Sequence, residues 1–113
     1  MDNCLFCKIV SGEIPSSKVY EDEYVYAFND IAPQAPTHIL FIPKQHITSA
    51  ADIDSENSFI VSKIFEAIAK VAKENGFQDG FRVVSNVGDS AGQTVKHLHF
   101  HVLSGRDMTW PPG

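Results

Sequence analysis

The chain is short of cysteines and of positive charge. It has 2 cysteines among 113 residues, and its 9 lysines and arginines stand against 14 aspartates and glutamates, which gives a formal net charge of −5. Small secreted domains usually depend on several disulfides, and proteins that bind nucleic acid carry basic patches. We therefore expect a cytoplasmic protein that does not bind nucleic acid.

Long hydrophobic runs are missing as well. A membrane-spanning helix needs about 20 successive apolar residues, and no stretch of the sequence approaches that length. Residues 1–4 also lack the basic and apolar character of a secretory signal. The sequence does contain 43% hydrophobic residues, including 8 Phe, which a chain of this length can bury in one core. We predict a single domain over residues 1–113 with no membrane partner.

Apolar, β-branched and aromatic residues predict several short strands. The segments expected to be strands are residues 19–20, 24–28, 38–42, 81–85 and 95–103. The first two flank an acidic turn and should form a hairpin. A brief helical turn is expected over residues 4–10, and two prolines predict a loop over residues 29–37.

One long helix is expected between the strands. Over residues 55–75 apolar side chains recur at the spacing of an amphipathic helix. Asp54 or Ser55 can cap its start, and Gly76 suits a left-handed stop. The order of elements predicts an α+β fold, in which the helix covers one face of an antiparallel sheet of about five strands.

The most informative segment is His97-Leu98-His99-Phe100-His101. Alternate side chains of a strand share one face, so the three histidines would lie together about 7 Å apart. A row of imidazoles is not needed for packing. Two chemistries remain open: the imidazoles could bind a catalytic metal, or one could be a nucleophile that its neighbours orient.

A glycine-containing loop precedes these histidines. Residues 88–94 read Gly-Asp-Ser-Ala-Gly-Gln-Thr, and such a loop can turn backbone N–H groups toward an anion. Because no cluster of Lys or Arg accompanies it, a single phosphate suits it better than a polyphosphate chain.

The alternating histidines, with apolar residues between them, resemble the signature of the histidine triad (HIT) family. The terminal Trp-Pro-Pro-Gly is similar to the branch of histidine triad nucleotide-binding proteins (HINT). The segments that carry the resemblance are residues 28–31, 36–38, 42–46, 92–95, 97–103 and 110–113.

The resemblance implies a purine nucleoside 5′-phosphoramidate hydrolase, which cleaves the P–N bond through a nucleotidyl-histidine intermediate and releases a nucleoside monophosphate and an amine. His99 would be the nucleophile, and His101 would contact the phosphate and assist the leaving amine. His38 would sit behind the nucleophile in a proton relay, and Asp30 would bind the ribose hydroxyls. The base would contact Phe6, Phe28 and Ile31, and the phosphate would contact Asn86, Gly92, Gln93 and Thr94.

Cys4 and Cys7 form a C-x-x-C motif. On the residues alone it could be a redox pair, a pair of metal ligands or two small buried hydrophobes. The resemblance implies metal ligands, because some bacterial-type members of the family hold zinc with such a pair and two histidines, here His46 and His97. Four protein ligands leave no open position for substrate, so this zinc would be structural.

The resemblance also implies a homodimer. Protomers would pair through the long helix and a strand, with residues 110–113 near the partner's pocket. A second function stays open, that of a nucleotide-binding regulatory or scaffold protein in which catalysis is incidental.

Overall fold

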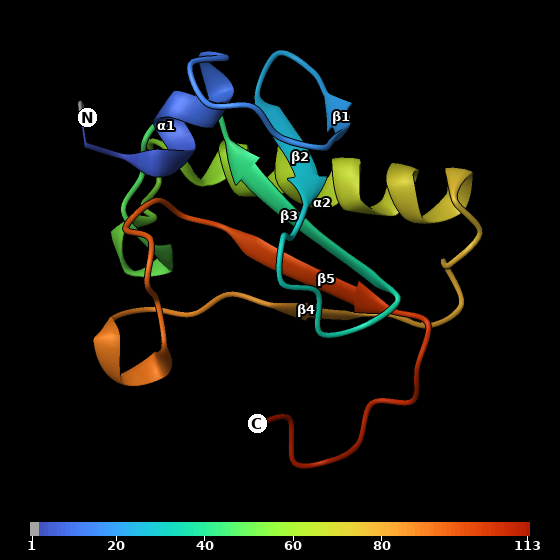
Figure 1. Ribbon diagram of the computed structural model, residues 1–113. Helices are drawn as coiled ribbons and strands as arrows, with labels where there is room; N and C mark the ends of the chain where they lie inside the picture. The colour runs from blue at the N-terminus through green and yellow to red at the C-terminus, as the bar shows by residue number, and fades with distance from the viewer. Residues whose placement is uncertain (1–2) are drawn as a thin grey trace.

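Figure 1 shows a computed structural model, which describes residues 3–113. Five antiparallel strands form one sheet in the order β1-β2-β3-β5-β4, and the predicted α+β class is confirmed. The elements are α1 (Leu5–Val10), β1 (Lys18–Glu21), β2 (Val25–Asn29), β3 (Thr37–Pro43), η1 (Ala50–Asp52), α2 (Ser58–Glu74), β4 (Arg82–Val84), η2 (Asp89–Ala91) and β5 (Phe100–Ser104).

The central strand β3 pairs with β2 on one side and β5 on the other. Successive side chains of a strand point to opposite faces, and β3 has a covered face on each side. Phe41 belongs to the apolar cluster beneath α2, whereas Ile42 packs with Phe6 and Ile9 of α1. The long helix therefore covers one face of the sheet and the short helix covers part of the other (Figure 1).

The long helix α2 begins three residues later than expected, at Ser58. The Asp54 carboxylate accepts hydrogen bonds from the N–H groups of Glu56 and Asn57, so it stabilises a turn ahead of the helix. The predicted stop is confirmed, because Gly76 has a φ of 76°, which suits glycine. The buried side of α2 consists of Ile60, Ile64, Ala67, Ile68, Val71 and Ala72.

The last strand is shorter than the prediction of residues 95–103, and this part of the prediction is wrong. β5 begins at Phe100. Before it, the Leu98 N–H donates to the Ile47 carbonyl across the fold, and His97 Nε2 bonds to the Pro43 carbonyl. These contacts bend the chain toward β3 and away from the regular ladder.

The alternation of side chains survives this bend. Leu98 packs in the cluster beneath α2 together with Phe100 and Val102. The intervening histidines are therefore directed to the opposite face, which is the face that α1 covers.

Within residues 3–113, no helix has the length and apolar character needed to cross a membrane.

Candidate functional site

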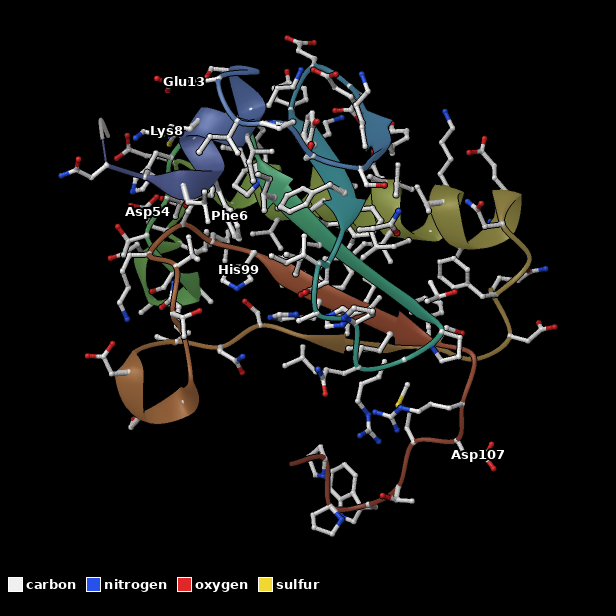
Figure 2. The ribbon with its side chains drawn as sticks, viewed as in Figure 1. Phe6, Lys8, Glu13, Asp54, His99 and Asp107 are labelled. Atoms are coloured by element: carbon white, nitrogen blue, oxygen red, sulfur yellow. The ribbon has the colours of Figure 1, made fainter. Side chains whose placement is uncertain are left out.

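The candidate site lies on the α1 face of the sheet, where β5 begins. His38 stands on β3 and His101 on β5, with Leu40 of β3 paired opposite His101. His99 precedes β5, and Figure 2 shows it beside Phe6, below α1. The site is thus supplied by the adjacent strands β3 and β5 and by the helix α1 above them.

The imidazole of His99 is oriented by a backbone carbonyl. Its Nδ1 lies 2.7 Å from the His97 carbonyl oxygen, and a carbonyl can only accept, so Nδ1 carries the proton. Burial lowers the pKa of His99 below its ordinary value. At neutral pH the ring is therefore uncharged and its Nε2 keeps a free lone pair, which is the form a nucleophile needs.

Two phenylalanines line the site beside His99. The ring of Phe6 meets the rings of His99 and Phe28 edge-on, with centroids 5.1 and 5.5 Å apart. Ile31, the third residue expected at the base, is 100% exposed. The structure thus brings Phe6 and Phe28 together as a buried wall and places Ile31 on the open loop after β2.

The second pair of histidines is joined by a direct hydrogen bond. The Gln34 N–H donates to Nδ1 of His38 at 3.0 Å, so the proton of a neutral His38 is on Nε2. That Nε2 donates to Nδ1 of His101 at 2.9 Å. The proton of a neutral His101 is consequently on Nε2.

His38 was expected to sit behind the nucleophile, and the structure places it behind His101 instead. The two residues are diagonal neighbours on β3 and β5, whereas His99 lies before the ladder begins. Any relay through His38 therefore reaches the site through His101. Burial, together with nearby His99 and His38, lowers the pKa of His101 to about 4.

The carboxylate of Asp30 completes this group. Its Oδ2 lies 3.4 Å from Nε2 of His38 and 4.0 Å from Nδ1 of His101. The three side chains are close enough together to hold a metal ion. However, the Gln34 hydrogen bond puts a proton on the His38 nitrogen that faces the group, and a protonated nitrogen cannot bind a metal. The arrangement favours proton transfer.

The loop around η2 is fixed by Gln93. Its side-chain amide donates to the carbonyls of Thr48 and Val95 and accepts from the Gly88 N–H, and its own N–H bonds to the Gly88 carbonyl. Gln93 was expected to hold phosphate oxygens, but these bonds use its donors within the protein. Gly92, with a φ of 86°, and the exposed Thr94 lie at the surface of the same loop.

Two further residues hold the site in place. The Lys96 ammonium group contacts the Asp89 carboxylate and the Gln93 carbonyl, at 2.6 and 2.8 Å. The Ser85 hydroxyl donates to the His99 carbonyl. The sequence alone indicates no role for Lys96 or Ser85, because their hydrogen-bond partners are set by the fold and leave no motif.

Cys4, Cys7, His46 and His97 come together next to the segment that carries His99. Nδ1 of His97 lies 3.3 Å from Sγ of Cys4 and 3.5 Å from Sγ of Cys7, and Nδ1 of His46 lies 3.3 Å from Sγ of Cys7. All four donor atoms lie within 4.8 Å of one another. Zinc with bonds of about 2.0–2.3 Å holds tetrahedral ligands roughly 3.3–3.8 Å apart, so the four residues fit a zinc ion.

The protonation of this cluster also suits a metal. The Pro43 carbonyl accepts from Nε2 of His97, which leaves Nδ1 unprotonated toward the cysteines, and burial lowers the pKa of His97 to about 4. Burial and the neighbouring Cys4 raise the pKa of the Cys7 thiol to about 11. A bound cation would reverse this by favouring the thiolate.

Known proteins with similar sequences and structures share this fold. A 14 kDa zinc-binding protein from Zea mays is 50% identical, over 96% of this chain and 87% of its own. A HIT family hydrolase from Legionella pneumophila Philadelphia 1 superposes with a TM-score of 0.95 at 50% identity, covering 98% of this chain and 100% of that one. A histidine triad nucleotide-binding protein from Candida albicans gives a TM-score of 0.86 at 35% identity, with coverages of 98% and 85%.

The family to which the sequence matches is the one named by the two structural relatives, and it fits the geometry of the three histidines. The model of the HIT domain matches residues 11–108, which include β1 to β5 and all three histidines. The chain therefore belongs to the HIT domain family.

Proposed function

We propose that the protein is a purine nucleoside 5′-phosphoramidate hydrolase that works through a nucleotidyl intermediate on His99. One observation carries this proposal. The bond from His99 Nδ1 to the His97 carbonyl leaves Nε2 free as a nucleophile, and the ring of His101 lies beside it with centroids 5.1 Å apart. A nucleophile and a proton carrier in contact are what cleavage of a P–N bond needs.

The reaction has two halves. First, Nε2 of His99 attacks phosphorus, the P–N bond breaks, and its electron pair stays on nitrogen, which takes a proton from His101 and leaves as the amine. Water then attacks the same phosphorus, the bond to His99 breaks, and the nucleoside monophosphate is released. The proton that the water loses returns to His101, so each turnover restores the enzyme.

The nucleotide is held by the residues around this centre. The base lies against Phe6, Phe28 and Ile31, and the complete exposure of Ile31 supports this, because a ligand would bury an apolar side chain that nothing else covers. The ribose binds Asp30. The phosphate is held by His101 and by the loop residues Asn86, Gly92 and Thr94.

A structural zinc ion is part of the proposal. Cys4, Cys7, His46 and His97 would hold it, and the donor distances above support this assignment. When bound, the ion supplies no catalytic chemistry, since four protein ligands leave no position for water or substrate. The residues themselves then tie α1 to the segment that carries His99. Two neighbouring thiols also suit a reducing, cytoplasmic environment.

We further infer a homodimer. Phe59 and Phe65 of α2 contact the rings of Tyr24 and Phe100 and are still 49% and 45% exposed, and Trp110 of the C-terminal segment is 83% exposed. Large apolar side chains in the open often mark a protein interface. Sedimentation should give about twice the 12.5 kDa of the chain, and a mass near that of one chain at micromolar concentration would exclude the dimer.

Rapid-quench mass spectrometry with adenosine 5′-phosphoramidate tests the proposed function. A mass increase of one nucleotidyl group should appear on His99 and decay as AMP forms. If AMP binds but the substrate is never cleaved, the protein is a nucleotide-binding module instead. If an adduct forms on a residue other than His99, the proposed mechanism is wrong.

A further inference from the structure

The hydrogen bond between His38 and His101 raises a problem for proton donation. In the neutral pair, the Nε2–H of His38 points at Nδ1 of His101, and His101 holds one proton, on Nε2. A neutral imidazole that gives up its only proton becomes an anion, which is very unfavourable near pH 7. The ligand-free pair is neutral near pH 7, so it must take up one extra proton, which the negative charge of a bound phosphate favours, before it can serve the leaving amine.

The extra proton would disrupt the hydrogen bond between His38 and His101. It would sit on Nδ1 of His101, so that two N–H groups would face each other across the 2.9 Å that separates Nδ1 from His38 Nε2. The Gln34 N–H bond to His38 Nδ1 prevents His38 from moving its proton to the other nitrogen. The charged pair needs a hydrogen-bond acceptor close to both atoms.

Asp30 supplies that acceptor. Its Oδ2 is 3.4 Å from Nε2 of His38 and 4.0 Å from Nδ1 of His101, so a small shift brings it into hydrogen-bond reach of both. Its Oδ1 accepts from the Ala32 N–H at 2.8 Å, which fixes the carboxylate in this direction. The side chains of His38 and Asp30 are 4% and 17% exposed, so water screens the interaction only weakly.

We propose that Asp30 is a positioning residue for proton transfer, whose Oδ2 accepts the facing N–H groups and so allows the His38–His101 pair to carry the proton that the departing amine takes. This inference rests on the proposed hydrolase function. It adds a second role to the expected binding of ribose by Asp30. The two roles are compatible, because a carboxylate oxygen can accept more than one hydrogen bond.

The protons balance over the cycle. His101 Nε2–H moves to the amine nitrogen as the P–N bond breaks, and His101 keeps its Nδ1 proton and becomes neutral. In the second half, Nε2 of His101 takes a proton from the attacking water, which restores the charged pair beside Asp30. No other acid or base is required.

Asp30→Asn separates this role from ribose binding. The amide keeps an oxygen for the Ala32 N–H and can still bond a hydroxyl. It removes the negative charge and turns an NH₂ donor toward the Nε2–H of His38. Two substrates at saturation provide the comparison: an alkylamine 5′-phosphoramidate of adenosine, whose leaving group needs a proton, and the p-nitrophenyl ester of AMP, whose leaving group does not.

The expected result is a selective loss in the first half of the reaction, measured as release of the leaving group in a single turnover. The pre-steady-state rate of amine release from the alkylamine substrate should fall about 100-fold or more, the range that general acid catalysis contributes, while the burst rate of p-nitrophenolate release should stay within about threefold. The matched control is Glu13→Gln, which removes the same charge from an exposed residue in the turn after α1 (Figure 2) and should change neither value. Equal losses on both substrates, or a change in KM alone, would overturn the proposal.

A second measurement tests the effect of Asp30 on the protonation of His101 independently of turnover. With AMP bound, ¹⁵N NMR of the imidazoles should show His101 protonated on Nδ1 in the wild type and unprotonated in Asp30→Asn. The same protonation in both proteins would contradict the role of Asp30. Failure of the wild type to cleave the alkylamine substrate would instead refute the proposed function and leave the NMR comparison to decide the inference.

Discussion

The ring of Phe6 packs edge-on against the ring of His99, with centroids 5.1 Å apart. Phe6 lies between Cys4 and Cys7 in the first turn of α1, and it also contacts the ring of His97. One short helix thus carries both half of the proposed metal ligands and a wall of the proposed nucleotide site. The metal cluster and the nucleophile are mechanically connected through this helix.

Removing the metal should therefore disturb nucleotide binding before it affects chemistry. A six-residue helix has little stability of its own, so without its metal ligands α1 should loosen and carry Phe6 with it. We expect chelation to lower the thermal midpoint and to raise KM several-fold, with kcat much less affected. Calorimetry and steady-state kinetics, before and after chelation, measure both.

The metal content provides the control. Protein purified without chelator should hold about one zinc per chain, and Cys4→Ser combined with Cys7→Ser should remove it. Zinc retained in this double variant would place the ligands elsewhere. Loss of kcat at unchanged KM on chelation would indicate a catalytic metal instead.

The buried histidines predict that acid destabilises the fold. Burial lowers the pKa of His101 from 6.5 in the unfolded chain to about 4 in the fold, so between these values the unfolded chain binds more protons. The stability that comes from a neutral His101 is complete above pH 6.5 and is lost as the pH falls toward 4. Its size is about 3 kcal/mol at most.

Urea unfolding at several pH values, with metal removed, measures this effect. The free energy of unfolding should decline from pH 6.5 to pH 4 in the wild type. In His101→Asn the decline should be smaller, because one of the titrating imidazoles is absent. An unchanged slope in the variant would show that His101 does not contribute.

Gln93 should matter for the shape of the loop more than for charge. Its buried amide bonds to three backbone groups, in Thr48, Gly88 and Val95. Gln93→Ala leaves buried carbonyls without donors, at a cost of about 1–3 kcal/mol each where water cannot replace them. We expect lower stability and a higher KM, whereas Gln78→Ala, on the surface, should change neither. A normal melting curve for Gln93→Ala would contradict this assignment.

The sequence predicts the fold more fully than the proton positions in the site. The spacing of apolar residues over residues 55–75 predicts the bounds of α2 to within three residues. The alternation over residues 97–101 predicts which side chains point away from the apolar cluster beneath α2. It does not predict the bend before Phe100, because the Leu98 N–H bonds to Ile47, which is far away in the chain. The tautomers of the histidines are set by the Gln34 N–H and by the carbonyls of Pro43 and His97. Every residue carries such backbone groups, so the sequence does not indicate which of them will bond to a histidine.

Replacing His99 and His101 separately should give two different kinetic results. His99→Ala removes the atom that bonds to phosphorus, so kcat should fall by several orders of magnitude. His101→Ala removes a proton carrier, and the loss should be smaller, about 10²–10⁴-fold. It should also be smallest for substrates whose leaving group needs no proton.

Binding of AMP separates these losses from misfolding. Asp30 and the Gly92–Thr94 loop remain in both variants, so calorimetric titration should give AMP affinities within about tenfold of the wild type. Ser85→Ala adds a geometric control, because it removes the bond to the His99 carbonyl while leaving the imidazole in place. Its kcat should fall much less than that of His99→Ala, because the nucleophile itself remains. Turnover by His99→Ala near the wild-type rate would exclude covalent catalysis at this residue.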